Sequence, residues 1–207
     1  MSRMSILGVA LLLGAAAACS DPEKDRIKAT TQATYDPKTG RLNRLTADLN
    51  KDGKIDAWTY MDGTKVLRTE IDADQDGKIE KWEFHGDDGK VARVAVSREK
   101  NGKPDTWMYP GPDGKLARAE ISSEQDEKKI DRWEWYEADQ LVRAEEDASG
   151  DGKVDKWETF KDGALTSVML DENYDGTADR RLNYGPRGEL RSIESEPDGK
   201  GGFRKRI

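Results

Sequence analysis

The chain has 207 residues, of which 34% are hydrophobic and 37% are charged. So polar a composition argues against a large close-packed globule, while six Trp, six Tyr and three Phe are more aromatic residues than a disordered chain carries. The charge is mixed, with 42 acidic and 35 basic side chains and a net charge of -7. We therefore expect no nucleic-acid partner.

Residues 1–18 have the features of a secretory signal peptide. Arg3 precedes an apolar run, Ile6 to Ala18, that is too short to cross a bilayer. The run ends in Ala-Ala-Ala-Cys19-Ser20, and small residues before a lone Cys resemble the lipobox of bacterial lipoproteins. The resemblance implies cleavage before Cys19 and its acylation, palmitate included. It also implies a membrane anchor in the cell envelope, in the outer membrane because Ser20 follows. An ordinary signal peptide is the alternative.

Residues 19–26 are predicted to be the lipidated Cys and a polar tether, and residues 27–207 a domain of β-repeats. The tryptophans give the period, since Trp58, Trp82, Trp107, Trp133 and Trp157 follow one another at 24, 25, 26 and 24 residues. Such self-similarity is the signature of a repeat architecture. Because Cys19 is the only Cys, the domain is stable without an intramolecular disulfide.

Each repeat holds two runs that alternate with the period of a β-strand. Glu80, Trp82 and Phe84 share one side of their run, and Asp-Gly pairs such as Asp88-Gly89 between runs are a strong hairpin signal. Short connections at both ends make neighbouring strands antiparallel. The predicted fold is all-β, an antiparallel β-meander of about 12–14 strands from ~25-residue hairpin repeats, curled or barrel-like.

The alternation also predicts two chemically different faces. One carries the aromatic residues, and we expect the aliphatic residues of the following runs to join it: Leu67, Ile71, Val94, Val96, Ile121, Val142, Val168 and Leu170. The opposite face is expected to carry opposite charges on neighbouring strands, namely Arg68, Arg93, Arg118 and Arg143 with Glu83, Glu134 and Glu158.

Two resemblances agree with repeated hairpins. The segment Tyr35 to Leu42, YDPKTGRL, is similar to the YD repeats of Rhs-type proteins. Gly-Lys-hydrophobic turns followed by a Trp-containing strand resemble the YwqK/MORN-like bacterial repeats. Both imply a β-hairpin fold and say little about function.

One connector has the spacing of a calcium loop. In the segment from Asp72 to Glu83, acids occupy positions 1, 3, 5, 9 and 12, and Gly stands at position 6. This fits the EF-hand loop, whose alternate oxygens converge on a hard cation. The expected ligands are Asp72, Asp74, Asp76, Glu80, Glu83 and the carbonyl of Lys78.

The flanking runs alternate as strands, and three more connectors share the pattern DxDxDGxxD. This pattern is similar to the calcium loops of integrin α-chain β-hairpins. The further candidate ligands are Asp48, Asn50, Asp52 and Asp56; Asp147, Ser149, Asp151, Asp155 and Glu158; and Asp171, Asn173, Asp175 and Asp179. The segments 97–105 and 122–131 depart from the pattern, and we expect no metal in 122–131. The alternative is that all these loops are turns without metal.

No catalytic constellation is visible, and His85 is the only His. Carboxylate pairs keep a glycosidase open as an alternative, but regularly spaced acids are explained by metal loops, and we predict that the protein is not an enzyme. The predicted function is a membrane-anchored lipoprotein whose repeats, with structural calcium, form a binding or scaffold module for an unidentified protein or glycan. The alternative is carbohydrate or cell-wall binding through the Trp/Tyr stripe, with the acidic loops as plain turns.

Overall fold

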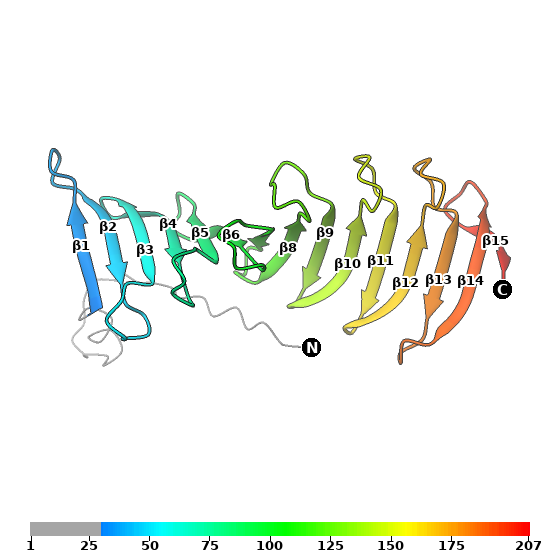
Figure 1. Cartoon of the computed structure of the whole chain (residues 1–207). Coiled ribbons are helices and arrows are strands. Elements are labelled where there is room, and N and C mark those ends of the chain that lie inside the picture. The colour runs from blue at the N-terminus through cyan, green and yellow to red at the C-terminus, as the bar shows by residue number, and fades with distance from the viewer. Residues whose placement is uncertain (1–29) are drawn as a thin grey trace.

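The computed structural model describes residues 30–207, which form one sheet of fifteen antiparallel strands (Figure 1). The strands are β1 (Thr31–Tyr35), β2 (Leu42–Ala47), β3 (Ala57–Asp62), β4 (Lys65–Ile71), β5 (Lys81–His85), β6 (Val91–Val96), β7 (Thr106–Pro110), β8 (Leu116–Ile121), β9 (Arg132–Glu137), β10 (Gln140–Glu146), β11 (Lys156–Lys161), β12 (Ala164–Leu170), β13 (Arg180–Tyr184), β14 (Leu190–Pro197) and β15 (Phe203–Arg206). The predicted all-β meander is confirmed. The predicted signal peptide, Cys19 and the tether lie outside the described residues.

The strands follow one another in chain order, each paired with the next, so the sheet is open with β1 and β15 at its edges. The sheet twists along its length. In Figure 1 the long connectors lie below the strands near β2 to β5 and above them from β8 to β13. This follows from the fixed hand of strand twist. The described residues include no helix with the length and hydrophobicity needed to cross a membrane.

A β-bulge follows the tight turn of each of seven hairpins and sets the register. Between β3 and β4, Tyr60 pairs with Arg68 and Met61 with Val66, so Leu67 has no partner. The same shift leaves unpaired Asn43, Ala92, Ala117, Val142, Thr166 and Arg191. One extra residue exchanges the faces of every residue beyond it. Two of the sequence predictions fail for this reason.

The four arginines lie on the aromatic face, not opposite it. Their register partners include Tyr60, Phe84 and Trp135, and each guanidinium lies 4.0–4.6 Å from the centroid of an aromatic ring. A second row on the same face alternates Trp with Glu or Ala, as in Trp58, Glu70, Trp82, Ala95 and Trp107. Trp107 is buried, with 2% exposed, and the other Trp residues of the row are half-buried.

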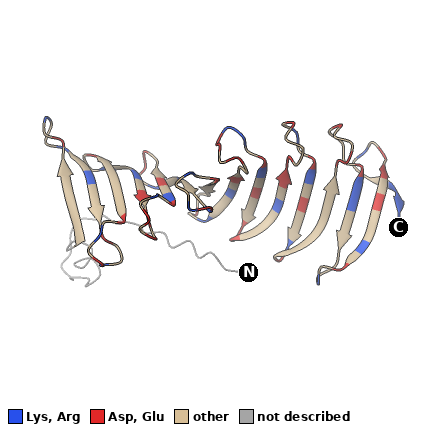
Figure 2. Ribbon diagram, viewed as in Figure 1, with Lys and Arg blue, Asp and Glu red and all other residues tan. Residues whose placement is uncertain are grey.

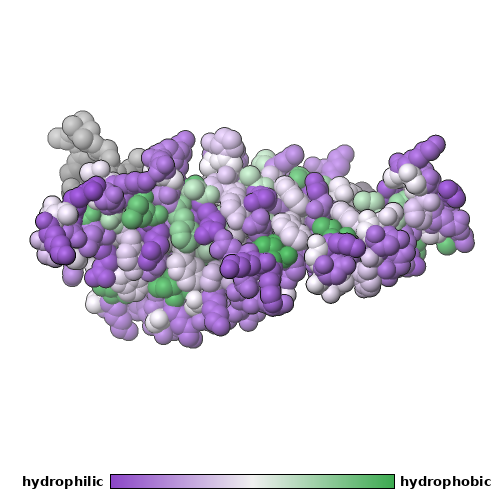
Figure 3. All heavy atoms as spheres, turned by 90° about the horizontal axis from the view of Figure 1, so that it is seen from above, coloured by the Kyte–Doolittle hydropathy of each residue, from purple (hydrophilic) through white to green (hydrophobic). Residues whose placement is uncertain are grey.

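The aliphatic residues lie on the opposite face. Val94 pairs with Glu83 and Met108. The aromatic face therefore does not receive Ile71, Val94, Val96, Ile121, Val168 and Leu170. The three glutamates predicted for this second face do lie on it: Glu83, Glu134 and Glu158. In Figure 3 hydrophobic residues form separate patches between hydrophilic ones. A single-layer sheet thus remains polar enough for both faces to meet water.

Candidate metal centres

The ends of the strands form two further edges of the sheet. Six long connectors lie along one of these edges, each joining an even-numbered strand to the next. We name them the first loop (48–56), second loop (72–80), third loop (97–105), fourth loop (122–131), fifth loop (147–155) and sixth loop (171–179). Acidic residues recur along this edge (Figure 2). The tight turns lie on the opposite edge because the strands are antiparallel. The fold thus gathers the predicted ligands into a row of similar loops.

Four of these loops share one frame of hydrogen bonds to their acids. The carboxylate at position 1 accepts the amide of the Gly at position 6, as in Gly77 N to Asp72 Oδ2 at 3.0 Å. The same bond is 2.6–2.8 Å long in the first, fifth and sixth loops. The carboxylate at position 9 accepts an amide from position 2 or 3 in each. Gly77 has a φ of 89°, which only Gly adopts readily.

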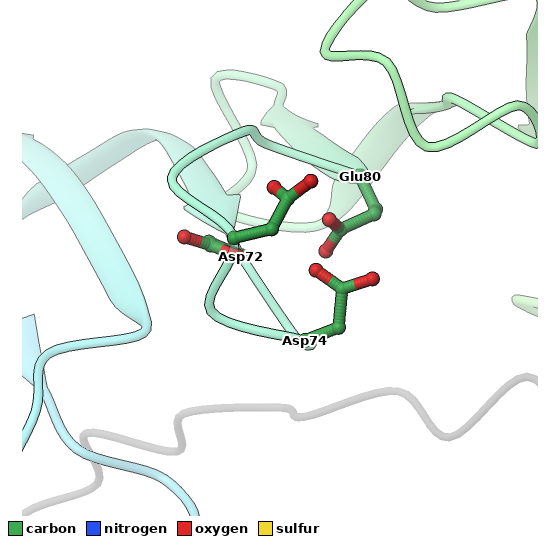
Figure 4. Close-up of side chains that lie close together, drawn as sticks. Asp72, Asp74 and Glu80 are labelled. Atoms are coloured by element: carbon green, nitrogen blue, oxygen red, sulfur yellow. The ribbon is translucent and has the colours of Figure 1, made fainter.

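The second loop gathers four carboxylates. One oxygen from each of Asp72, Asp74, Asp76 and Glu80 lies within 4.8 Å of the others. Figure 4 shows Asp72, Asp74 and Glu80 together at the loop. Asp72 is 5% exposed and Glu80 9%, and neither Asp72 Oδ1 nor Glu80 Oε1 has a hydrogen-bond partner. Buried charged oxygens without a partner are costly, so a cation bound between these carboxylates would stabilise them.

The electrostatics of the second loop point the same way. Burial raises the pKa of Glu80, and the neighbouring carboxylates of Asp74 and Asp72 raise it further. The pKa of Asp74 is lowered, first by its hydrogen bond from Lys100 of the third loop. A divalent cation would relieve the repulsion that Glu80 meets.

The fifth loop forms a smaller cluster. Oxygens of Asp147, Asp151 and Asp155 lie within 4.8 Å of one another. Asp155 is 4% exposed, its Oδ2 accepts the amide of Ser149 at 2.7 Å, and its Oδ1 has no partner. Ser149 Oγ lies 3.3 Å from Asp147 Oδ1. The predicted ligands of this loop are thus brought together, except Glu158.

Within the described residues, the carboxylates of the first and sixth loops do not form such a cluster. Both carry Asn at position 3, and the side-chain amide of this Asn donates hydrogen bonds to the acids that would otherwise bind a metal. Asn173 Nδ2 lies 3.2 Å from Asp175 Oδ2 and 3.4 Å from Asp179 Oδ1. Asn50 Nδ2 lies 3.5 Å from Asp52 Oδ2, and the two oxygens of Asp56 accept amides of Leu49 and Asn50. Asp48 and Asp171 keep the shared frame.

The residues at position 12 lie apart from the clusters. Glu83 is in β5 on the second face, 5% exposed, with Lys81 Nζ 2.6 Å from its Oε1. Glu158, in β11, pairs with Lys156 at 2.9 Å and Arg132 at 2.9 Å. Strand geometry explains this, because a helical EF-hand would turn position 12 back to the metal and an extended strand carries it away. The side chain of Lys78 forms an ion pair with Asp76, in which Nζ lies 3.1 Å from Oδ2.

The third and fourth loops hold cations of the protein itself. Arg98 Nε lies 2.7 Å from Asp105 Oδ1, and the Arg98 amide donates to Asp105 Oδ2 at 2.8 Å. In the fourth loop Lys129 pairs with Glu124 at 2.5 Å. Arg98 and Lys100 were not among the residues predicted from the sequence. Their signal was present, since Arg98 stands at position 2, where the second and fifth loops have Ala.

Comparison with known proteins supports the calcium-loop pattern of two of the loops. The EF-hand family model matches residues 46–57 and 69–85, which contain the first and second loops. A search of curated proteins finds no match. One similar solved structure is an S. aureus TarM mutant in complex with fondaparinux, alpha-GlcNAc-glycerol and UDP. Its TM-score is 0.36 and its identity 15%, over 51% of this chain and 22% of that one. Another contains accessory secretory proteins of Streptococcus pneumoniae, with a TM-score of 0.26 and 13% identity over 70% and 19% of the two chains.

Proposed function

We propose that this protein is a calcium-binding β-repeat protein in which the second and fifth loops hold structural calcium. The observation that carries the proposal is the set of three buried carboxylate oxygens without partners, Asp72 Oδ1, Glu80 Oε1 and Asp155 Oδ1. Each belongs to a converging acidic cluster. Without a cation these oxygens destabilise the fold, and with one they become ligands.

The ligand chemistry favours calcium over other cations. Both clusters consist of carboxylates, with no His or Cys among them, and all-oxygen ligation suits hard cations. The second loop offers four carboxylates, and the Lys78 carbonyl and water would complete the six to eight oxygens that calcium takes. Magnesium prefers to keep several waters and a stricter octahedron. Modules outside the cytoplasm bind calcium at about 10⁻⁴–10⁻³ M, which suits a permanently occupied structural site.

The proposal also places the protein in the bacterial cell envelope. Residues 1–18 would direct export, and acylated Cys19 would anchor the domain to the membrane, in the outer membrane by the lipobox resemblance. The anchored sheet would act as a non-enzymatic scaffold or binding module for a protein or glycan. In support, a single-layer sheet leaves both faces open to partners.

Carbohydrate binding through the aromatic stripe has less support. A sugar would stack on ring faces, but Arg68, Arg93, Arg118 and Arg143 lie over Tyr60, Phe84, Tyr109 and Trp135. Trp107, in the middle of the other aromatic row, is buried. A sugar would therefore have to displace guanidinium groups from most of the row.

The calcium proposal is tested on the full chain in detergent by calorimetric titration with calcium chloride, and by thermal unfolding with calcium or with chelator. We expect binding at millimolar calcium or below and a higher unfolding midpoint with calcium. Asp72→Ala with Asp76→Ala should abolish the second site. The control is Asp113→Asn, since Asp113 caps a tight turn on the opposite edge. Absence of heat and of any midpoint shift would reduce the loops to turns.

The anchor is tested separately by fractionation. We expect the wild-type chain in the membrane fraction of bacterial cells, with the mass of acyl chains added at Cys19 and residues 1–18 removed. Cys19→Ser should release an unacylated chain. Equal partition of both proteins would leave only an ordinary signal peptide.

A further inference from the structure

The third loop makes a contact that crosses to the second. Lys100 Nζ lies 2.9 Å from Asp74 Oδ2, and Asp74 is one of the four carboxylates of the second cluster. The contact joins residues 26 positions apart in the chain. Lys100 is the fourth residue of its loop and has a φ of 52°, a left-handed conformation that a Lys rarely adopts. The loop thus fixes the position from which the Lys side chain extends.

The third loop can supply this lysine because it needs no metal of its own. Asp105, at position 9, is 2% exposed and fully engaged by Arg98 and by the Thr106 hydroxyl at 2.7 Å. At position 1, Ser97 replaces Asp, and its hydroxyl lies 3.3 Å from Asn101 Oδ1. The guanidinium of Arg98 thus neutralises the carboxylate at position 9, which a metal would otherwise do.

We propose that Lys100 is a tethered competitor that sets the calcium affinity of the second loop, an inference that rests on the proposed function. Its ammonium holds Asp74 while the site is empty, and calcium binding displaces it. The carboxylate then turns fully to the metal. Among the described residues, no lysine of a neighbouring loop pairs with an acid of the fifth-loop cluster. The second and fifth loops would therefore differ in calcium affinity although their frames agree.

The magnitude follows from the charges involved. Lys100 and Asp74 have exposed side-chain fractions of 62% and 37%, so their ion pair alone is weak. Calcium and an ammonium sharing one carboxylate also repel each other through water. Together these effects should weaken calcium binding by about three- to tenfold.

The test measures calcium binding at the second loop alone. The background carries Asp56→Asn, Asp155→Asn and Asp179→Asn, which disable the other acidic loops, and Glu80→Gln in this background should abolish the remaining signal. Full-length chains are titrated with calcium chloride in a calorimeter, after circular dichroism has verified the strands. Lys100→Gln should raise the affinity about three- to tenfold, while Lys100→Arg should stay near the wild-type value.

Lys51→Gln is the matched control. Lys51 occupies position 4 of the first loop, the other neighbour of the second loop, with a φ of 66°. It forms no ion pair among the described residues, so the same charge change there should leave the affinity within twofold. An equal gain in both variants would overturn the tethered-competitor role, as would no gain in Lys100→Gln. Absence of calcium binding in every chain would overturn the proposed function together with this inference.

Discussion

Arg68 in β4 lies over the ring of Tyr60 in β3, with 4.0 Å between the guanidinium carbon and the ring centroid. Both side chains also contact Glu70, Arg68 Nε at 2.8 Å and Tyr60 Oη at 3.0 Å. The unit recurs two repeats on, where Arg118 lies over Tyr109 and both contact Glu120. A single-layer sheet has no second layer to bury its rings, and these arginines cover them instead.

Arg68→Gln should lower the free energy of unfolding by about 1 kcal/mol, because it removes a cation–π contact and a half-exposed ion pair. The measurement is the urea midpoint at constant slope. Arg191→Gln is the control, since Arg191 is exposed and, within residues 30–207, Glu189 is the only acid with which it forms an ion pair. If the two substitutions cost the same, the stacking on Tyr60 contributes nothing.

The faces of the sheet could be predicted only in part, and Leu67 shows why. The alternation within each run was right, as in Trp82 and Phe84, which do share a face. The run Lys65 to Ile71 alternates equally well in either orientation, so its pairing with β3 depends on whether the turn contains a bulge. Leu67 is that bulge. No residue type marks it, since other bulge positions hold Asn43, Ala92 and Thr166.

The Asp105–Arg98 pair should make the free energy of unfolding depend on pH. Burial would raise the pKa of Asp105, but hydrogen bonds from Arg98 and Thr106 outweigh it and leave the pKa below its usual value. An acid whose pKa is lower in the folded chain stabilises the fold above its unfolded pKa of about 3.9. This stability is lost as the pH falls through the folded pKa.

Asp105→Asn should therefore cost about 1–2 kcal/mol at neutral pH, and the difference from wild type should shrink below about pH 3.9. Urea unfolding between pH 2 and 7 measures it. Asp113→Asn, in a tight turn on the other edge, should cost less at neutral pH. A difference that stays constant across the pH range would contradict the charge-assisted role of Asp105.

Arg132 is the centre of a charge network on the second face. It contacts Glu134 at 2.8 Å, Glu146 at 3.1 Å and Glu158 at 2.9 Å. Arg132→Met should lower the free energy of unfolding by about 2–3 kcal/mol, because Glu146 and Glu158 would share Lys156 and Glu134 would lose its ion pair. Adding Glu158→Leu should cost less than the two single changes together, as a double-mutant cycle measures. Strict additivity would show that Arg132 acts through packing alone.

The ligand positions were predictable from spacing, but their convergence was not. The pattern DxDxDGxxD fits the second, fifth and sixth loops alike, with Asn, Ser or Asp at position 3. In the sixth loop the amide of Asn173 donates to Asp175 and Asp179, while in the second loop Asp74 has only acceptors to offer. Lys100 reaches Asp74 from another repeat. Such a contact depends on how adjacent loops stack, which no local pattern specifies.

Glu80→Gln should change stability in opposite directions with and without calcium. In chelator the substitution removes a charge that burial and the carboxylates of Asp72 and Asp74 disfavour. The new amide can still accept the Ala73 amide and can donate to a neighbouring carboxylate, so the variant should gain about 1 kcal/mol. With calcium at 10–100 times its dissociation constant, wild type should gain about 1.4–2.7 kcal/mol that the variant lacks. The two unfolding curves should therefore exchange order.

The control is Glu99→Gln, at an exposed acid of the third loop, which should unfold at the wild-type midpoint both with calcium and in chelator. A Glu80→Gln chain less stable than wild type in chelator would mean that Glu80 is a structural hydrogen-bonding group and not a ligand awaiting its metal.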